Sequence, residues 1–166
     1  MNETPPAGSI GPGSVVGQYR VLRSIGRGGM GEVYLARDLA LGRRVALKVL
    51  HADAMGSPEA VERFLGEART TARFSHPHIV TVFGAGMHWG NPFVVLEYLE
   101  GETLRQRLDQ GTLGVREALR LGRAVADALG ELHRHGILHR DLKPENVVIP
   151  ADGRPRVLDF GLAQPL

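Results

Sequence analysis

A glycine-rich segment near the N-terminus places the strongest restriction on the fold of this chain. Residues 26–31 read Gly-Arg-Gly-Gly-Met-Gly and fit the spacing G-x-G-x-x-G. Glycines at this spacing let backbone amides approach phosphate groups closely, although they also occur in ordinary hairpin turns. A dinucleotide-binding segment would open a helix, and a P-loop would end in Gly-Lys-Ser or Gly-Lys-Thr. Here the strand-like run 32–37 follows, so a strand-turn-strand unit is expected.

Short apolar runs separated by turn signals predict an antiparallel meander in the first half of the chain. Five strands are expected, at residues 19–25, 32–37, 44–50, 79–83 and 92–98. Alternation along the third run places Lys48 on one face and three apolar side chains on the other. These three are Val45, Leu47 and Val49.

Helical signals interrupt and follow these strands. A helix is expected to begin at Ser57, with Pro58 in its first turn, and to end before the His76-Pro77 pair. The longest helical pattern covers residues 115–135, with apolar side chains at helical spacing. Shorter elements complete the pattern, namely a helix at 104–110 and strands at 146–149 and 156–159, joined by the turn signal Asp152-Gly153.

The chain is expected to divide into three parts. Residues 1–17 are rich in small residues and proline without periodicity, so they are predicted to be a disordered leader. Residues 18–100 form the strand-rich unit with one long helix, and Gly101 marks the junction. Residues 101–166 form a helix-led unit.

Composition excludes several classes of protein. Hydrophobic residues make up 43% of the chain and charged residues 23%, as in ordinary soluble domains. The absence of cysteine excludes a disulfide framework and thiolate metal sites. No apolar run of about 18 residues exists, so no membrane contact is expected within this chain. A cytoplasmic location is therefore expected. This expectation is compatible with a membrane segment further downstream in a longer protein. The net charge of only +2 speaks against nucleic-acid binding.

The chain uses arginine almost wherever it needs a positive charge. It contains 18 arginines and two lysines, Lys48 and Lys143. The planar guanidinium fork cannot replace a compact ammonium in a tight site, so both lysines are site candidates. Lys48 follows Gly26 by 22 residues on an expected strand, where an inward-facing ammonium is costly unless it meets an anion. Glu67, 19 residues further on, is its candidate partner, although it could also be a solvated surface acid.

Two further segments carry the resemblance to a known family. Residues 139–146 read His-Arg-Asp-Leu-Lys-Pro-Glu-Asn, and residues 159–161 read Asp-Phe-Gly. With the glycine-rich loop, the strand lysine and the helix glutamate, they resemble in order the signature of protein kinases. The Lys-Pro-Glu sequence that follows Asp141 resembles that of Ser/Thr kinases. The sequences of residues 25–31 and 74–80 resemble those of bacterial kinases of the eukaryotic type.

The resemblance covers residues 18–166 and implies a fold. It is an α+β, bilobal protein-kinase-like fold. Its N-terminal lobe would hold a five-stranded antiparallel sheet and one long helix, and its C-terminal helical lobe would be incomplete.

The resemblance also implies transfer of the γ-phosphoryl group of ATP to Ser or Thr of a protein substrate, with Mg²⁺. It assigns Asp141 to orienting the substrate hydroxyl and Lys143 to neutralising charge on the transferred phosphoryl group. Lys48, paired with Glu67, would hold the α- and β-phosphates. No nucleic-acid partner is implied, and the motifs do not bear on dimerisation.

Further residues follow from the same resemblance. Asn146 and Asp159, 13 residues apart, would supply oxygen ligands to Mg²⁺. The positions implied for phosphate cover, adenine pocket and hinge are Ile25, Gly26, Gly28, Gly31, Val33, Ala46, Glu97, Leu99 and Val148. Most of these are apolar enough to form a core in any fold, so the adenine pocket is carried by the resemblance alone.

The chain ends five residues after Gly161, before the activation segment that such a kinase would contain. A fragment with impaired activity is therefore expected, with ATP affinity uncoupled from turnover. Positioning of the kind that the absent helices would give a peptide accounts for about 7–11 kcal/mol of barrier lowering. One alternative is a non-catalytic nucleotide-binding or scaffolding remnant, against which the filled catalytic positions argue. The other is a small-molecule kinase of the aminoglycoside-phosphotransferase type, against which the complete motifs argue.

Overall fold

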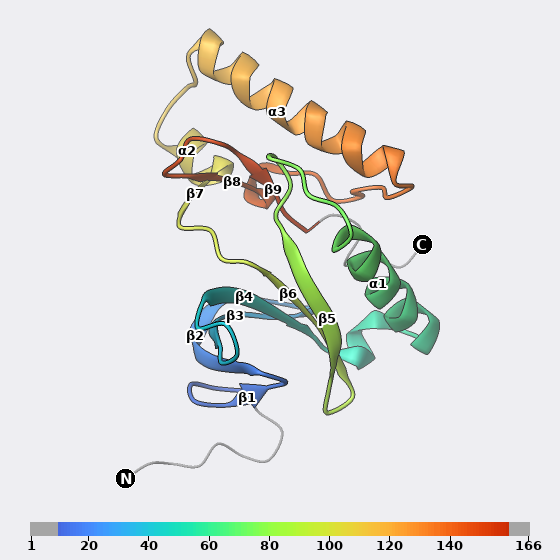
Figure 1. Ribbon diagram of the computed structural model, residues 1–166. Coiled ribbons are helices and arrows are strands. Elements are labelled where there is room, and N and C mark those ends of the chain that lie inside the picture. Colours follow the sequence, from blue (N-terminus) through green and yellow to red (C-terminus); the bar gives the residue numbers. More distant parts are fainter. Residues whose placement is uncertain (1–9, 160–166) are drawn as a thin grey trace. The chain divides into compact units, whose positions relative to one another are not determined.

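Two β-sheets organise the chain, one in each of two units (Figure 1). The computed structural model describes residues 10–159. The first unit is formed by Met1–Leu65 and Val82–Tyr98, and the second by Gly66–Thr81 and Leu99–Leu166. Residues 1–9 of the expected leader lie outside the described residues, as do Phe160 and Gly161 of the Asp-Phe-Gly motif.

The sheet of the first unit is antiparallel and contains six strands in the order β1-β2-β3-β4-β6-β5. They are β1 (Val15–Val16), β2 (Tyr19–Gly28), β3 (Gly31–Asp38), β4 (Arg44–Leu50), β5 (Val82–His88) and β6 (Asn91–Glu97). The predicted meander is confirmed, but the expected number of five strands is wrong. The additional strand is β1, which pairs Val15 with Arg20 and Val16 with Tyr19.

The strand β1 also corrects the predicted disordered leader, because it lies within residues 1–17. Val16 is fully buried and belongs to the same core cluster as Val21 and Tyr34. Gly13 N–H donates to the carbonyl of Val21 at 2.8 Å, which extends the pairing toward the N-terminus. Two valines are too short a run to show period-two alternation, so the sequence pattern missed a strand that burial stabilises.

A strand expected at residues 79–83 is displaced in the structure. The strand β5 begins at Val82 and runs to His88. The preceding Ile79 forms a parallel bridge with Val157, and Val80 N–H donates to the carbonyl of Val157 at 3.1 Å. Both side chains are buried, so this apolar pair belongs to the second unit. The expected boundary near residue 100 therefore misplaces residues 66–81, which the structure groups with the second unit.

One buried hydrophobic cluster of the first unit lies on a single face of its sheet. Val45, Leu47 and Val49 of β4 are all buried there, as their alternation predicts. Tyr34, Ala36 and Val95 from the neighbouring strands complete this face. The residues between them on β4, Ala46 and Lys48, therefore point to the opposite face.

Between these strands, the chain forms η1 (Ala52–Met55) and the helix α1 (Pro58–Thr71). The predicted start of α1 is confirmed, since Ala60 N–H donates to Ser57 Oγ at 3.2 Å. The helix ends at Thr71, before the expected His76-Pro77 stop, and a turn at residues 72 and 73 follows.

From residue 99 to residue 159, the second unit combines helical elements with a small sheet. The helices are α2 (Leu104–Asp109), α3 (Val115–Arg134) and η2 (Pro144–Asn146), and the strands are β7 (Gly101–Thr103), β8 (Val147–Pro150) and β9 (Arg156–Val157). The predicted helices near 104–110 and 115–135 are confirmed, as is the hairpin of β8 and β9. The strand β7, which pairs with β8, was not expected from the sequence.

The helix α3 presents one apolar stripe to its unit, formed by Leu121, Ala124, Ala128 and Leu132. Figure 1 shows this helix running past β9 in the second unit. Within residues 10–159, no helix has the length and apolar character needed to cross a membrane.

Candidate functional site

The glycine-rich segment forms the hairpin between β2 and β3, as the sequence predicts. Gly26 pairs with Val33, and Gly28 pairs with Gly31 at the end of the ladder. A methyl group added at Gly28 would meet nothing within 4 Å, and one at Gly26 would meet only the Val33 side chain, at 3.8 Å. Neither packing nor a left-handed φ angle therefore requires glycine at positions 26 and 28.

Gly31 differs from these two glycines. A methyl group there would lie 2.1 Å from the carbonyl oxygen of Val49 and 2.8 Å from the Cα atom of Leu50, both backbone atoms of β4. Only glycine fits such a close approach of two strands. The fold thus accounts for Gly31, whereas Gly26 and Gly28 leave bare backbone that a ligand could approach.

Polar side chains brace this hairpin in a way that the sequence analysis missed. The carboxylate of Glu32 accepts a hydrogen bond from Ser24 Oγ at 2.6 Å and one from Arg27 Nη2 at 3.0 Å. The Ser24 hydroxyl, followed by the Arg27 guanidinium, lowers the pKa of Glu32. Arg27 is 79% exposed, so the ion pair itself contributes little stability.

The strand register brings the predicted nucleotide residues of the first unit onto one face of the sheet. Lys48 lies opposite Val33 on β3 and Val94 on β6, and Ala46 lies opposite Leu96. Directly opposed residues of antiparallel strands share a face. The residues paired with Lys48 and Ala46 on this face are therefore apolar, and Val94 and Leu96 among them are buried.

Two other predicted residues of the first unit lie at its margins. Ile25 stands at a register shift of β2, between Ser24 and Gly26, and is 37% exposed. Glu97 is the last residue of β6 and pairs with Val45.

In the second unit, the expected catalytic loop holds three of its predicted residues in contact. Lys143 Nζ lies 3.1 Å from Asp141 Oδ2. Asn146 Nδ2 donates to Asp141 Oδ2 at 3.2 Å and to the Asp141 carbonyl at 2.8 Å. The hydrogen bond from Lys143 is the main cause of the lowered pKa of Asp141, and Asn146 adds to it. Asp141 is therefore ionised at neutral pH.

His139 connects this loop to the segment after β9. Its Nε2 atom lies 2.7 Å from the carbonyl oxygen of Leu158, and Asp141 N–H donates to its Nδ1 atom at 3.2 Å. Because a carbonyl only accepts and an amide N–H only donates, the neutral tautomer with the proton on Nε2 satisfies both contacts. This histidine is buried, and its contact with the Asp141 amide helps to position Asp141.

The two predicted metal ligands are linked through the backbone. Leu158 N–H donates to the carbonyl of Asn146 at 2.8 Å, which brings the residue before Asp159 beside Asn146. Since Asn146 Nδ2 is the donor to Asp141, its Oδ1 atom is the one that could bind a cation. Asp159 has a left-handed φ of 52°, and Arg140, next to Asp141, has one of 64°. Such strain in residues other than glycine commonly accompanies functional sites.

The donor set fits Mg²⁺ only as part of a shared site. Among the described residues, no group of three or more His, Cys, Asp or Glu side chains could hold a metal alone. Asn146 and Asp159 offer oxygen donors, and Mg²⁺ commonly takes one or two protein ligands and completes its shell with phosphates and water. A nucleotide phosphate could complete this shell.

The remaining predicted residues also lie in the second unit. Val148 is buried on β8, opposite Thr103 and Arg156. Leu99 lies in the segment between β6 and β7, and Glu67 is half-buried on α1. The pairing of Glu67 with Lys48 stays a prediction.

Comparison with known proteins identifies close resemblance in sequence. The "Protein kinase domain" family matches residues 19–166. Probable serine/threonine-protein kinase pknA2 of Bifidobacterium longum is 44% identical over 99% of this chain. Serine/threonine-protein kinase pkn2 of Myxococcus xanthus is 44% identical over 93% of it. The chain spans 22% and 19% of the lengths of these two curated relatives.

Solved structures agree with the sequence comparison. The kinase domain of PknI from Mycobacterium tuberculosis superimposes with a TM-score of 0.85 at 36% identity. The match covers 94% of this chain and 64% of that domain.

We predict that replacing Lys143 with alanine raises the pKa of Asp141 toward its ordinary value. The rise is partial, because Asn146 Nδ2 still donates to the carboxylate. A carboxylate whose pKa is lowered by folding stabilises the fold at pH values above its pKa in the unfolded chain. This stabilisation is lost as the pH falls through the pKa of the folded state. The variant should therefore lose less stability on acidification than the parent.

Titration of side-chain carboxyl carbons by NMR measures this change. Asp152 is an internal reference, since its pKa is lowered first by the backbone N–H of Arg154 and then by Arg156. An unchanged Asp141 titration, or an equal shift at Asp152, would contradict the assignment.

Proposed function

The chain belongs to the protein kinase family, and we propose that it supplies the nucleotide-binding and catalytic-loop residues of a protein serine/threonine kinase. Its reaction would transfer the γ-phosphoryl group of ATP to a Ser or Thr hydroxyl of a protein. The fold resemblance to a bacterial kinase domain and the serine/threonine-kinase relatives support this class.

The observation that carries the proposal is the contact of Asp141 with Lys143 and Asn146. The Asp141 carboxylate is ionised and held by two side chains, and the Asp141 backbone N–H donates to His139 Nδ1, so the carboxylate is positioned to accept a hydrogen bond from a substrate hydroxyl. Lys143 is 48% exposed at its side chain, so its ammonium can turn from Asp141 toward an incoming phosphoryl group. Phosphoryl transfer depends chiefly on such positioning and charge neutralisation. This intact network also speaks against a non-catalytic remnant.

The first unit would bind the nucleotide. The bare backbone at Gly26 and Gly28 would cover the phosphates, and Lys48 would hold the α- and β-phosphates. Adenine would contact the apolar side chains that the resemblance to protein kinases implies. The positions proposed for this contact are Ile25, Val33, Ala46 and Val148, with backbone hydrogen bonds at Glu97 and Leu99.

Asn146 and Asp159 would hold Mg²⁺ by their side-chain oxygens. The cation, when bound, neutralises negative charge on the phosphate oxygens. The hydrogen bonds of Asn146 to Asp141 would then keep the metal ligand and the catalytic carboxylate at a fixed separation.

Replacing Asp141 with asparagine should abolish most phosphoryl transfer and leave Mg·ATP affinity near that of the parent. The loss expected from removing a general base is about 10²–10⁴-fold in rate. The measurement is transfer of labelled phosphate to a generic protein substrate by the full gene product that contains this chain, with nucleotide affinity measured in parallel. The matched control is Asp109→Asn, an exposed aspartate of α2 that pairs with Arg105. Equal rates in the two variants would refute the role of Asp141.

Replacing Asp159 with alanine should weaken Mg·ATP binding. Affinity for Mg·ATP should fall at least about tenfold, because even the mutation of a residue that hydrogen-bonds to a metal ligand lowers metal affinity by about that factor. Calorimetric titration of this chain with ATP, with and without Mg²⁺, measures it, and Asp109→Ala is the control. Unchanged affinity, or the same loss in the absence of Mg²⁺, would exclude the metal role.

Lys48 and Glu67 should be energetically coupled. Lys48→Met and Glu67→Gln are each expected to weaken Mg·ATP binding, because a glutamate partner keeps the ammonium in place. If the two side chains pair, the double variant loses less Mg·ATP binding free energy than the sum of the two single-variant losses. The difference should be about 0.5 kcal/mol or more. The same titration measures the three affinities, and strictly additive losses would show that Glu67 acts elsewhere.

A further inference from the structure

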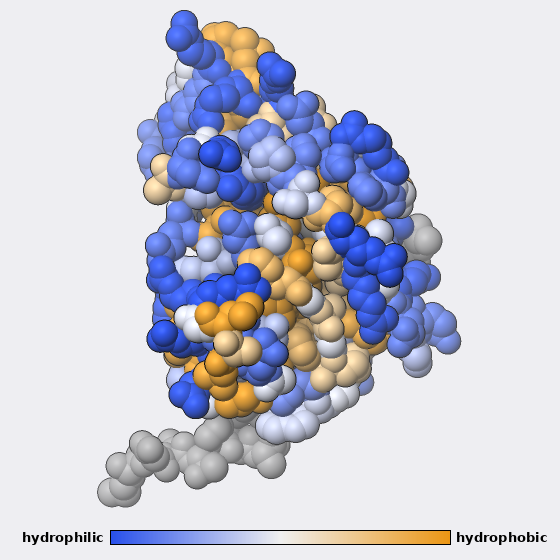
Figure 2. All heavy atoms as spheres, in the orientation of Figure 1, coloured by the Kyte–Doolittle hydropathy of each residue, from blue (hydrophilic) through white to orange (hydrophobic). Residues whose placement is uncertain are grey.

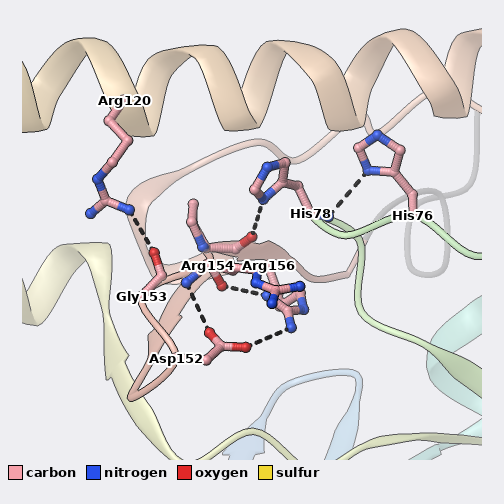
Figure 3. Close-up of polar contacts among 8 residues, drawn as sticks. His76, His78, Arg120, Asp152, Gly153, Arg154 and Arg156 are labelled. Atoms are coloured by element: carbon pink, nitrogen blue, oxygen red, sulfur yellow. Dashed lines mark hydrogen bonds and ion pairs between the residues drawn. The ribbon is translucent and has the colours of Figure 1, made fainter.

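A cavity lies within the second unit, and no residue of the segment 139–146 lines it. It encloses about 630 Å³ beside α3 and the turn that joins β8 to β9. Its lining is His78, Leu119, Arg120, Arg123, Ala124, Asp127, Gly153, Arg154 and Pro155. Figure 3 shows how Arg120 of α3 reaches toward this turn, with His78 nearby. None of these residues has a part in the proposed phosphoryl transfer.

The charge of this lining is strongly unbalanced. It contains three arginines and one carboxylate, that of Asp127. Arg120 Nη1 donates to the uncharged carbonyl of Gly153 at 2.5 Å. Arg123 meets Asp127 only at 3.8 Å, with both side chains more than half exposed, and such a pair is weak. The positive charge is therefore available to an anionic partner.

The turn that carries Arg154 is held firmly. Arg154 N–H donates to Asp152 Oδ1 at 2.8 Å, and Gly153 N–H donates to the carbonyl of Pro150 at 2.9 Å. Gly153 has a φ of 72°, which residues other than glycine rarely adopt. Arg156 Nη2 in turn donates to Asp152 Oδ2 at 3.0 Å. Figure 3 marks this contact with a dashed line. The Asp152 carboxylate is thus already engaged with the backbone of Arg154 and with the guanidinium of Arg156.

His78 is a further lining residue that is held in place. His78 Nδ1 lies 3.0 Å from the carbonyl oxygen of Pro155, so the ring donates there and is held against the turn. Fixed side chains and backbone lose little conformational freedom when a ligand binds, which favours affinity.

Apolar side chains border the arginines. Leu119 lines the cavity and is 69% exposed, and Val115, one helical turn before it, is 78% exposed. Figure 2 shows hydrophobic surface at the N-terminal end of α3, flanked by hydrophilic side chains. A ligand that matches this surface must carry both negative charge and an apolar group.

We propose that this cavity docks an acidic peptide segment of a partner protein, with carboxylates on Arg120, Arg123 and Arg154 and an apolar side chain on Leu119. A nucleic acid fits less well, since the lining offers no Phe, Tyr or Trp on which a base could stack, and Asp127 would face its phosphates. The proposal does not depend on phosphoryl transfer.

The probe for this proposal is a labelled synthetic peptide of alternating glutamate and leucine, and fluorescence anisotropy measures its affinity for the chain. Replacing Arg120 and Arg154 together with glutamine should weaken binding about tenfold, as expected for two charge-assisted contacts. The matched control replaces two exposed arginines outside the cavity, Arg20 and Arg73, and removes the same charge. It should bind nearly as tightly as the parent.

A variant that gains affinity separates the proposal from misfolding. Asp127→Asn removes the one carboxylate of the lining and should tighten peptide binding about two- to fivefold. Equal losses in the two double variants would overturn the proposal in favour of general charge attraction. Equal binding of a glutamine–leucine peptide would overturn it in favour of apolar contact. Displacement of the peptide by single-stranded oligonucleotide at lower concentration, through the same arginines, would overturn it in favour of a nucleic acid.

Discussion

The contacts of the buried His139 ring hold the proposed catalytic centre of the second unit together. One ring nitrogen binds the carbonyl of Leu158 and the other receives the amide of Asp141, so a single side chain joins the catalytic loop to the segment that leads to Asp159. A polar group left unpaired in such a buried place costs about 1–3 kcal/mol. The cost enforces one tautomer and one ring orientation, and these in turn set the position of the Asp141 backbone.

The functional groups are supported on this frame by short-range contacts. The side-chain Nδ2 of Asn146 donates to Asp141, and the backbone carbonyl of Asn146 accepts from Leu158 N–H. Asn146 therefore joins the same two segments that His139 joins. Two independent links between the same segments limit their relative movement more than either link alone. The left-handed backbone at Arg140 and Asp159, one at each segment, is strain that such links can maintain.

Sequence patterns predicted the elements whose side chains alternate or repeat over many residues. The faces of β4 and the stripe of α3 are examples, because burial on one side imposes a period that is visible in the sequence. The patterns failed where pairing partners decide the outcome. Val15–Val16 and Gly101–Thr103 are too short to show a period, and each is a strand because a longer neighbour provides its hydrogen bonds. Residue types identified the candidate site, but they do not tell which side chains contact each other. The contacts of Glu32 and His139 therefore became known only from the structure.

The distinction between lysine and arginine in this chain has a physical basis in the structure. Arg105, Arg107 and Arg156 each bind one carboxylate through two guanidinium nitrogens, or one carboxylate and one carbonyl, which fixes them as local braces. Lys143 instead meets Asp141 through one ammonium on a flexible stem, with both side chains partly exposed. Water screens such a contact, so it can be exchanged for another anion at little cost. A guanidinium in its place would bind Asp141 with two nitrogens and would have to break both contacts to reach a phosphoryl group. In the proposed reaction, the ammonium would therefore stabilise the carboxylate before a nucleotide binds and would remain available to the negative charge of the phosphates.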